Sequence, residues 1–177
     1  QNQSYTKSLF LSVNGFENIK SLLQGDDSIF LQLVNNKKNI KTSFVTNQDS
    51  YVTAKTHNFW KDFILQRMRW AGDANIMWKY NKFFFLIILS TFFANLSIIL
   101  FAISGFFKSD YFILLAMFLI FKFILEFILY LFGSLKLNRS LEITSFIFWA
   151  IFQVPYIVLM GILSFFAPSM NWRDSKA

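Results

Sequence analysis

The chain has 177 residues, of which 55% are hydrophobic and 20% aromatic, and its formal net charge is +7. A soluble domain averages about 45–50% apolar residues. Because the excess here falls after residue 82, a soluble part followed by a membrane part fits the composition better than a single globular core. The absence of cysteine and the single histidine exclude disulfides, thiolate metal sites and multi-histidine metal sites.

The first residue is Gln rather than Met, and no signal peptide precedes it. We therefore expect the N-terminal portion of the protein to be missing here. Residues 1–56 are then the C-terminal part of a larger domain.

An acidic doublet, Asp26-Asp27, follows Gly25 and precedes the apolar run 28–34, which is a short helix candidate. One interpretation is helix capping, because an Asp at a helix N-terminus accepts hydrogen bonds from free backbone N–H groups. The other is a catalytic carboxylate acting as a general base. The doublet alone favours the cap.

Residues 58–80 show the spacing of an amphipathic helix, with Trp at both ends and flanking Lys residues, which suits a helix in the membrane interface. Its apolar side is formed by Trp60, Phe63, Ile64, Met68, Ala71, Ala74 and Trp78.

A polar stripe on the same helix is formed by Gln66, Arg69, Trp70 and Asp73, which are spaced i, i+3, i+4 and i+7. The structural interpretation is that Trp70 packs under the preceding domain and Arg69 pairs with Asp73. The functional interpretation is a ligand-facing surface.

Three runs in residues 82–170 are long and apolar enough to cross a bilayer: 83–105, 111–132 and 143–167. Basic residues crowd the approach to the first run, which favours a membrane over nucleic acid as the partner and predicts a cytosolic N-terminal part. Alternation then puts the tail, residues 171–177, outside, although Arg173 and Lys176 argue mildly against this. From residue 55 to the start of the first run, the basic residues are Lys55, Lys61, Arg67, Arg69, Lys79 and Lys82.

Lys122 and Glu126 lie inside the second run, one helical turn apart. We expect a mutually neutralising pair that faces protein rather than an ion path, because the other runs offer no charged groups to continue a path. Asn95 and Gln153 are candidates for interhelical hydrogen bonds, and Pro155 is expected to kink the third run.

Together these segments resemble the second half of membrane-bound family 2 glycosyltransferases, which include cellulose-synthase-like and hyaluronan-synthase-like enzymes. The resemblance covers almost the whole chain. It is carried by Val13-Asn14-Gly15-Phe16-Glu17, Gly25-Asp26-Asp27, Trp60 with Phe63, the family's Gln-x-x-Arg-Trp motif at Gln66-Arg67-Met68-Arg69-Trp70, and weakly by Asn171-Trp172-Arg173.

This resemblance implies an α+β fragment of a GT-A (α/β) domain in residues 1–56. An interface helix at 57–81 and an all-α bundle of three transmembrane helices would follow. It implies an inverting hexosyl transfer from a nucleotide sugar to a glycan or lipid-linked acceptor, for the synthesis of a cell-surface polysaccharide or glycolipid.

The resemblance also implies roles for particular residues. Asp27 would be the catalytic base, supported by Asp26, and Arg69 and Arg67 would face the donor diphosphate. Trp70 and Gln66 would form the acceptor pocket. A loop at residues 53–58 would gate the site, but Thr56-His57 replaces a Pro that is common there, and His57, as one loop histidine, is more often inert than catalytic.

The family's metal-binding and uridine-binding acidic residues have no counterpart in this chain. A divalent metal, Mg or Mn, would therefore be held by ligands outside it. The expected partners are a UDP- or GDP-sugar, the acceptor and membrane lipids, with no nucleic acid, and the expected location is a bacterial inner membrane with the catalytic part in the cytosol. The alternatives are a non-catalytic transporter subunit or scaffold, and an inactive relative.

Overall fold

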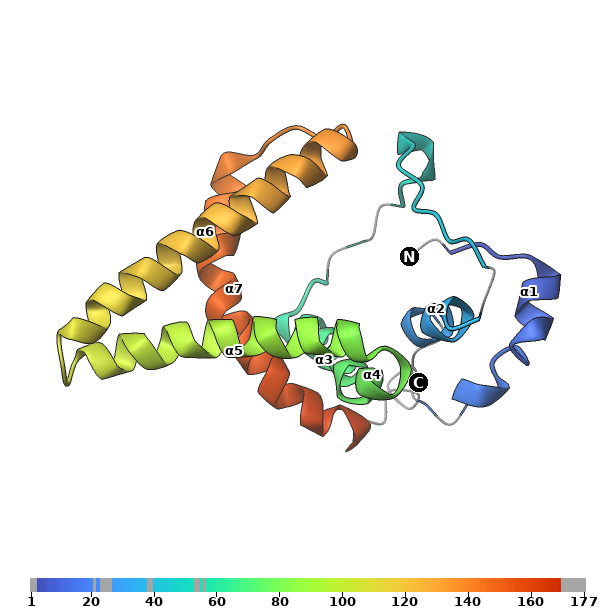
Figure 1. Cartoon of the computed structure of the whole chain (residues 1–177), viewed down its shortest axis with the longest axis horizontal. Helices are drawn as coiled ribbons and strands as arrows, with labels where there is room; N and C mark the ends of the chain where they lie inside the picture. The colour runs from blue at the N-terminus through green and yellow to red at the C-terminus, as the bar shows by residue number, and fades with distance from the viewer. Residues whose placement is uncertain are drawn as a thin grey trace. The chain divides into compact units, whose positions relative to one another are not determined.

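The computed structural model describes residues 3–20, 22, 27–37, 40–52, 55 and 57–169. The chain divides into two compact units. The first contains Gln1–Val45, Ser50–Ile88 and Met160–Ala177, and the second contains Thr46–Asp49 and Leu89–Leu159. Every regular element in the described residues is a helix (Figure 1).

The expected α+β fragment of a GT-A domain is therefore wrong: no strand occurs in the described part of the chain. Two physical reasons account for this. The buried residues Ile29, Phe30 and Val34 recur at the spacing of one helix face rather than alternating as in a strand. Residues 40–47 are not helical, but they form no ladder with another described segment.

The first unit begins with α1 (Lys7–Ser12), whose N-terminus is capped by the Thr6 hydroxyl accepting from Leu9 N–H at 3.2 Å. A tight turn follows, in which Asn14 and Gly15 both have positive φ, 61° and 57°. The turn leads into the short 3-10 helix η1 (Glu17–Ile19).

The core of the first unit is built around α2 (Ser28–Asn35), from which Ile29 and Phe30 are fully buried. The Phe30 ring meets the Phe16 ring at 5.4 Å between centroids, so the turn after α1 packs on α2. The other buried members of this core are Val13, Ile19, Val34 and Met77.

Helices α2 and α4 (Ala74–Tyr80) run side by side in the same direction. At one end, the Ser28 hydroxyl bonds the carboxylate of Asp73, the residue before α4, at 2.7 Å. At the other end, Asn36 Nδ2 donates to the carbonyl of Tyr80 at 3.0 Å. A further bond runs from Asn81 Nδ2 to Gln32 Oε1 at 2.9 Å, so α2 is tied to the α4 segment along its length.

The amphipathic segment is two helices rather than one. α3 (Trp60–Gly72) and α4 are separated at Asp73, which ends the first helix and begins the second. Gly72 at this position weakens a continuous helix, because glycine is about 1 kcal/mol less favourable than alanine in a helix interior. α4 packs on α2, while α3 carries Gln66, Arg69 and Trp70 of the polar stripe.

α3 packs on the 3-10 helix η3 (Ser164–Ser169), which follows the third long helix. α4 also contacts η3, where the amide of Asn75 and the hydroxyl of Ser164 exchange hydrogen bonds at 3.2 and 3.3 Å. η3 therefore lies against α3 and α4, whereas alternation of three full membrane crossings predicts that the end of the third long helix is on the side opposite to α3.

Three helices are long and apolar enough to cross a membrane, as the sequence predicted: Lys82–Gly105, Asp110–Lys136 and Ile143–Ala167. They correspond to α5 (Lys82–Gly105), α6 (Asp110–Lys136), and α7 (Ile143–Leu163) with the start of η3. In Figure 1, α5 and α6 meet at the turn of residues 106–109 and diverge from it.

The 3-10 helix η2 (Gln48–Ser50) is a short element before α3.

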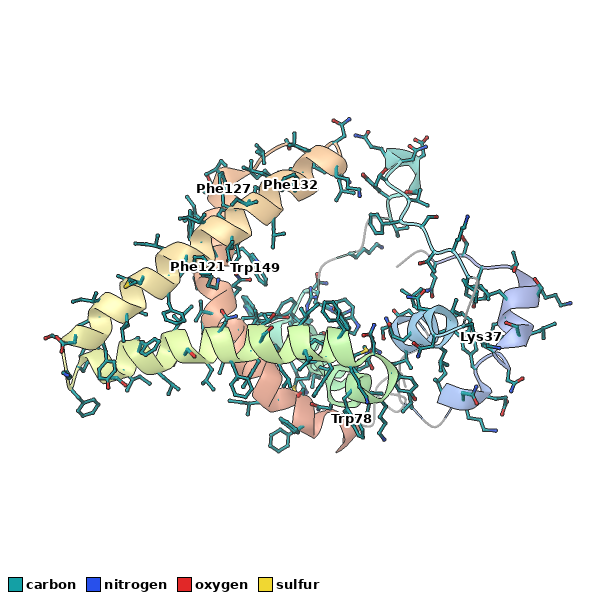
Figure 2. The ribbon with its side chains drawn as sticks, in the orientation of Figure 1. Lys37, Trp78, Phe121, Phe127, Phe132 and Trp149 are labelled. Atoms are coloured by element: carbon teal, nitrogen blue, oxygen red, sulfur yellow. The ribbon has the colours of Figure 1, made fainter. Side chains whose placement is uncertain are left out.

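Aromatic rings join the helices of the second unit. Phe146 of α7 lies against Phe123, Phe127 and Tyr130 of α6, with ring centroids 5.2, 5.4 and 5.1 Å away. Other large side chains of α6, such as Phe121 and Phe132, project outward from the helix (Figure 2) and are exposed, as expected for a surface that faces lipid rather than water.

Candidate functional site

The first unit contains both Asp27, the described residue of the acidic motif, and the Gln-x-x-Arg-Trp motif. Asp27 is the N-cap of α2, and its Oδ1 accepts a hydrogen bond from Ser28 N–H. The capping interpretation of Asp27 is thus confirmed. A carboxylate has two oxygens, so capping at Oδ1 is compatible with a second role at Oδ2. Asp26 lies outside the described residues.

Ser28 links the acidic motif to the end of α3. Its backbone N–H holds Asp27, and its hydroxyl holds Asp73, from a part of the chain 45 residues away. Asp73 follows Trp70 by one helical turn and ends α3. The N-terminus of α2 therefore lies at the C-terminal end of the polar stripe.

The polar stripe is carried by α3, whose continuous helix from Trp60 to Gly72 puts Gln66, Arg69 and Trp70 on one side. Gln66 and Arg69 are half-buried, and Trp70 is 49% exposed. An aromatic face that is half open to its surroundings is suited to contact a flat ligand such as a sugar ring.

Arg67 lies between two aromatic rings of the same helix. Its guanidinium carbon is 5.0 Å from the centroid of Phe63 and 4.6 Å from that of Trp70. These distances are within the range of cation–π attraction. The stack fixes the Trp70 ring on one face and adds positive charge beside it.

The expected gating loop is described only in part. His57 is exposed and lies outside any helix, while Thr53 and Thr56 lie outside the described residues. The C-terminal motif Asn171-Trp172-Arg173 also lies outside them. Among the residues that the structure describes, no three His, Asp or Glu side chains come close enough to hold a metal ion.

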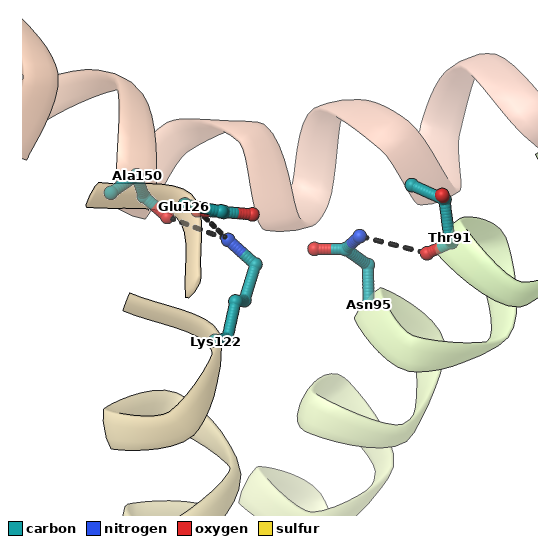
Figure 3. Close-up of polar contacts among 5 residues, drawn as sticks. All are labelled: Thr91, Asn95, Lys122, Glu126 and Ala150. Atoms are coloured by element: carbon teal, nitrogen blue, oxygen red, sulfur yellow. Dashed lines mark hydrogen bonds and ion pairs between the residues drawn. The ribbon is translucent and has the colours of Figure 1, made fainter. Parts of the chain in front are cut away.

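A second polar cluster lies within the long helices (Figure 3). Lys122 Nζ of α6 is 2.7 Å from Glu126 Oε2 and 3.4 Å from the carbonyl of Ala150 on α7. The pair predicted from the i,i+4 spacing is present, and it also bonds a neighbouring helix. Lys122 borders an apolar cavity of about 730 Å³ that Ile98, Ala102, Val154 and Pro155 help to line.

Asn95, on α5, is 3% exposed, and its Nδ2 donates to the carbonyl of Thr91 at 2.8 Å (Figure 3). This bond lies within α5, so the side-chain N–H of Asn95 does not form the interhelical hydrogen bond that the sequence predicted. Its Oδ1 accepts no hydrogen bond from the described residues.

No protein-family model, curated protein or solved structure matches this chain. The glycosyltransferase resemblance therefore remains an interpretation of the motifs.

The sequence did not predict the bond between Ser28 and Asp73. The two residues are far apart in the chain, and neither belongs to a motif that marks the contact. Two features of the sequence pointed to this bond only indirectly. Asp73 is the last residue of the polar stripe, and a Ser directly after an N-cap Asp can donate hydrogen bonds from both its backbone N–H and its hydroxyl.

Proposed function

We propose that this protein is the membrane-proximal part of an inverting glycosyltransferase that moves a sugar from a nucleotide sugar to a glycan or lipid-linked acceptor. The observation that carries the proposal is that α2 packs on α4 and bonds Asp73 at the end of α3, so that Asp27 belongs to the same compact unit as Gln66, Arg69 and Trp70. This common unit, tied by the bond from Ser28 to Asp73, supports a shared site for the two motifs.

In the proposed reaction, Asp27 is the general base. It accepts the proton of an acceptor hydroxyl as the acceptor oxygen attacks the anomeric carbon from the face opposite the diphosphate. The new glycosidic bond forms as the bond to the diphosphate oxygen breaks, and the nucleoside diphosphate leaves with the electron pair. A positioned base of this kind contributes about 10²–10⁴-fold in rate.

Arg69 is assigned to the leaving diphosphate, because a guanidinium bonds phosphate oxygens bidentately and offsets the charge that develops on them. Arg67 adds a second positive charge from its stack against Trp70. Trp70 lies under the acceptor sugar with its open face toward the ring C–H groups, and Gln66 shapes the pocket beside it.

The described residues offer no site for the divalent metal that the resemblance implies, so no step is assigned to a metal on them. The donor nucleotide and any Mg or Mn would be bound by parts of the full-length protein beyond these residues.

The long helices support a membrane-embedded enzyme. Six Lys and Arg residues between Lys55 and Lys82 support a cytosolic position for α3 in a bacterial inner membrane, where α3 would lie in the interface. Phe59 and Trp60, exposed at the start of α3, suit contact with lipid at that depth.

The proposal is tested by nucleotide release from purified full-length protein in detergent or nanodiscs. A panel of UDP-glucose, UDP-galactose, UDP-N-acetylglucosamine and GDP-mannose is incubated with membrane lipid extract and oligosaccharides as acceptors. We expect release of UDP or GDP from one donor, increased by acceptor. A folded protein that releases no nucleotide from any donor would overturn the proposal.

A further inference from the structure

We infer that Ser28 and Asp73 are positioning residues, which hold the carboxylate of Asp27 at a set place relative to the polar stripe of α3. This inference rests on the proposed function. It adds two residues that the motif resemblance does not include.

Ser28 makes two hydrogen bonds that connect Asp27 with Asp73. Its N–H donates to Asp27 Oδ1, which sets the direction in which the carboxylate points. Its hydroxyl donates to Asp73 Oδ2 at 2.7 Å. A hydrogen bond to an ionised carboxylate is about twice as strong as one between neutral groups, so this contact holds the Ser28 side chain firmly.

Asp73 lies at the end of α3, so its bond to Ser28 connects α2 with the helix that carries the polar stripe. Asp73 closes α3 one turn after Arg69 and Trp70, and so it moves as part of the helix that carries the proposed binding residues. The path from Asp27 through Ser28 to Asp73 therefore ties the base to these residues by two hydrogen bonds. A misplacement of a reacting group by about 1 Å is enough to slow an enzyme about 10²-fold.

Core packing alone does not set this geometry. Ile29, Phe30 and Val34 fix the far side of α2 in the core, but apolar contacts have no direction, and a small rotation of α2 would keep them buried while it swings Asp27. The bond from Ser28 to Asp73 opposes that rotation at the end of α2 where Asp27 lies.

The chain offers a matched control at the other end of α2. Asn36 also bonds the α4 segment, through the carbonyl of Tyr80 at 3.0 Å, but it lies eight residues after Ser28 and thus about two helical turns from Asp27. Asn36→Ala removes a tertiary bond between the same two segments without touching the path to the base.

The test compares variants of the full-length protein in the nucleotide-release assay, with the donor that the wild type uses. Ser28→Ala and Asp73→Ala are expected to lower kcat about tenfold or more and to leave KM for the donor within about twofold. Ser28→Thr keeps a hydroxyl and Asp73→Asn keeps an acceptor oxygen, so both are expected to retain most of the wild-type kcat. Asn36→Ala is expected to lower Tm without lowering kcat.

A double-mutant cycle separates positioning from general destabilisation. If Ser28 acts through Asp27, then Ser28→Ala causes no further loss of the residual rate in an Asp27→Asn background. A further tenfold loss in that background would contradict the inference.

Failure of this inference is distinguishable from failure of the proposed function. If Asp27→Asn is inactive while Ser28→Ala and Asp73→Ala turn over at the wild-type rate, only the positioning role is wrong. If Asp27→Asn itself keeps the wild-type rate, the base assignment is wrong and the positioning role falls with it. Should Asp73→Ala not fold, Ser28→Ala, which removes one hydroxyl, decides the matter alone.

Discussion

At the scale of single residues, the surroundings of Trp70 bear most directly on acceptor binding. One face is covered by Arg67, and the ring is still 49% exposed. A large aromatic surface left open beside polar neighbours marks a place where a ligand can bind.

Trp70→Ala is therefore expected to reduce acceptor-dependent transfer at least tenfold while donor hydrolysis by water falls less, because only transfer needs the acceptor ring to be held. The measurement compares nucleotide release with and without acceptor. Trp78→Ala is the matched control, since Trp78 is also 49% exposed but lies on α4 beside Lys79 rather than on the stripe. Equal loss of both reactions in Trp70→Ala would contradict the acceptor role.

Gly15 has a purely structural role that follows from its backbone. Its φ is +57°, and a Cβ built at this position would lie 2.7 Å from the Phe10 ring. Gly15→Ala is expected to destabilise the first unit by about 1–3 kcal/mol, through left-handed strain and displacement of that ring. A lowered Tm of the purified protein would show this.

Gly133→Ala is the control for Gly15. It lies in α6, where an added Cβ meets nothing within 4 Å, so alanine should leave Tm unchanged or raise it. A Gly15→Ala variant as stable as Gly133→Ala would show that the turn adopts another backbone conformation.

At the scale of elements, the Lys122–Glu126 pair ties α6 to α7. Glu126 neutralises the ammonium, and Ala150 of α7 accepts from it. Glu126→Ala removes the carboxylate from the partly buried Lys122 ammonium and leaves its bond to the Ala150 carbonyl. We expect the free energy of unfolding to fall by roughly 1–3 kcal/mol.

Replacing both charges, as Lys122→Met with Glu126→Leu, should recover most of that stability, because an ion pair in apolar surroundings can often be exchanged for hydrophobic side chains of similar size. The measurement is thermal unfolding in detergent for the single and double variants. A double variant no more stable than Glu126→Ala would show that the charges have a role beyond neutralising each other.

The elements also show what could be predicted from the sequence. The three long helices were predictable because apolar runs of more than twenty residues, with no charge or with a single opposite-charge pair, have few stable alternatives to a membrane span. The cap at Asp27 was predictable because its mechanism is local. The break between α3 and α4 was missed, since the apolar spacing continues through Asp73 and only Gly72 weakens it.

The fold class and the bond between Ser28 and Asp73 could not be read in this way. The expectation of a sheet came from the family resemblance, and the apolar spacing around Ile29 and Phe30 was in fact helical. The bond joins segments 45 residues apart, and such contacts depend on tertiary packing that no local pattern encodes.

At the scale of the whole molecule, the contact of α3 with η3 makes a prediction about topology. The chain has no cysteine, so single-cysteine variants can be labelled without background. The contact predicts that Phe165→Cys, at an exposed position of η3, reacts with an impermeant maleimide from the same side as Lys55→Cys. Labelling from opposite sides would show that the third long helix crosses completely and that α3 and η3 separate in the membrane.

The central claim is that Asp27 is the base of a sugar transfer, and the most direct measurement is kcat for nucleotide release by full-length Asp27→Asn protein. We predict a loss of at least about 10²-fold, with Tm close to that of the wild type because asparagine also caps helices. Asp49→Asn, which changes an exposed acid in a short 3-10 helix, should keep the wild-type rate. Turnover by Asp27→Asn within a few-fold of the wild type would contradict the account.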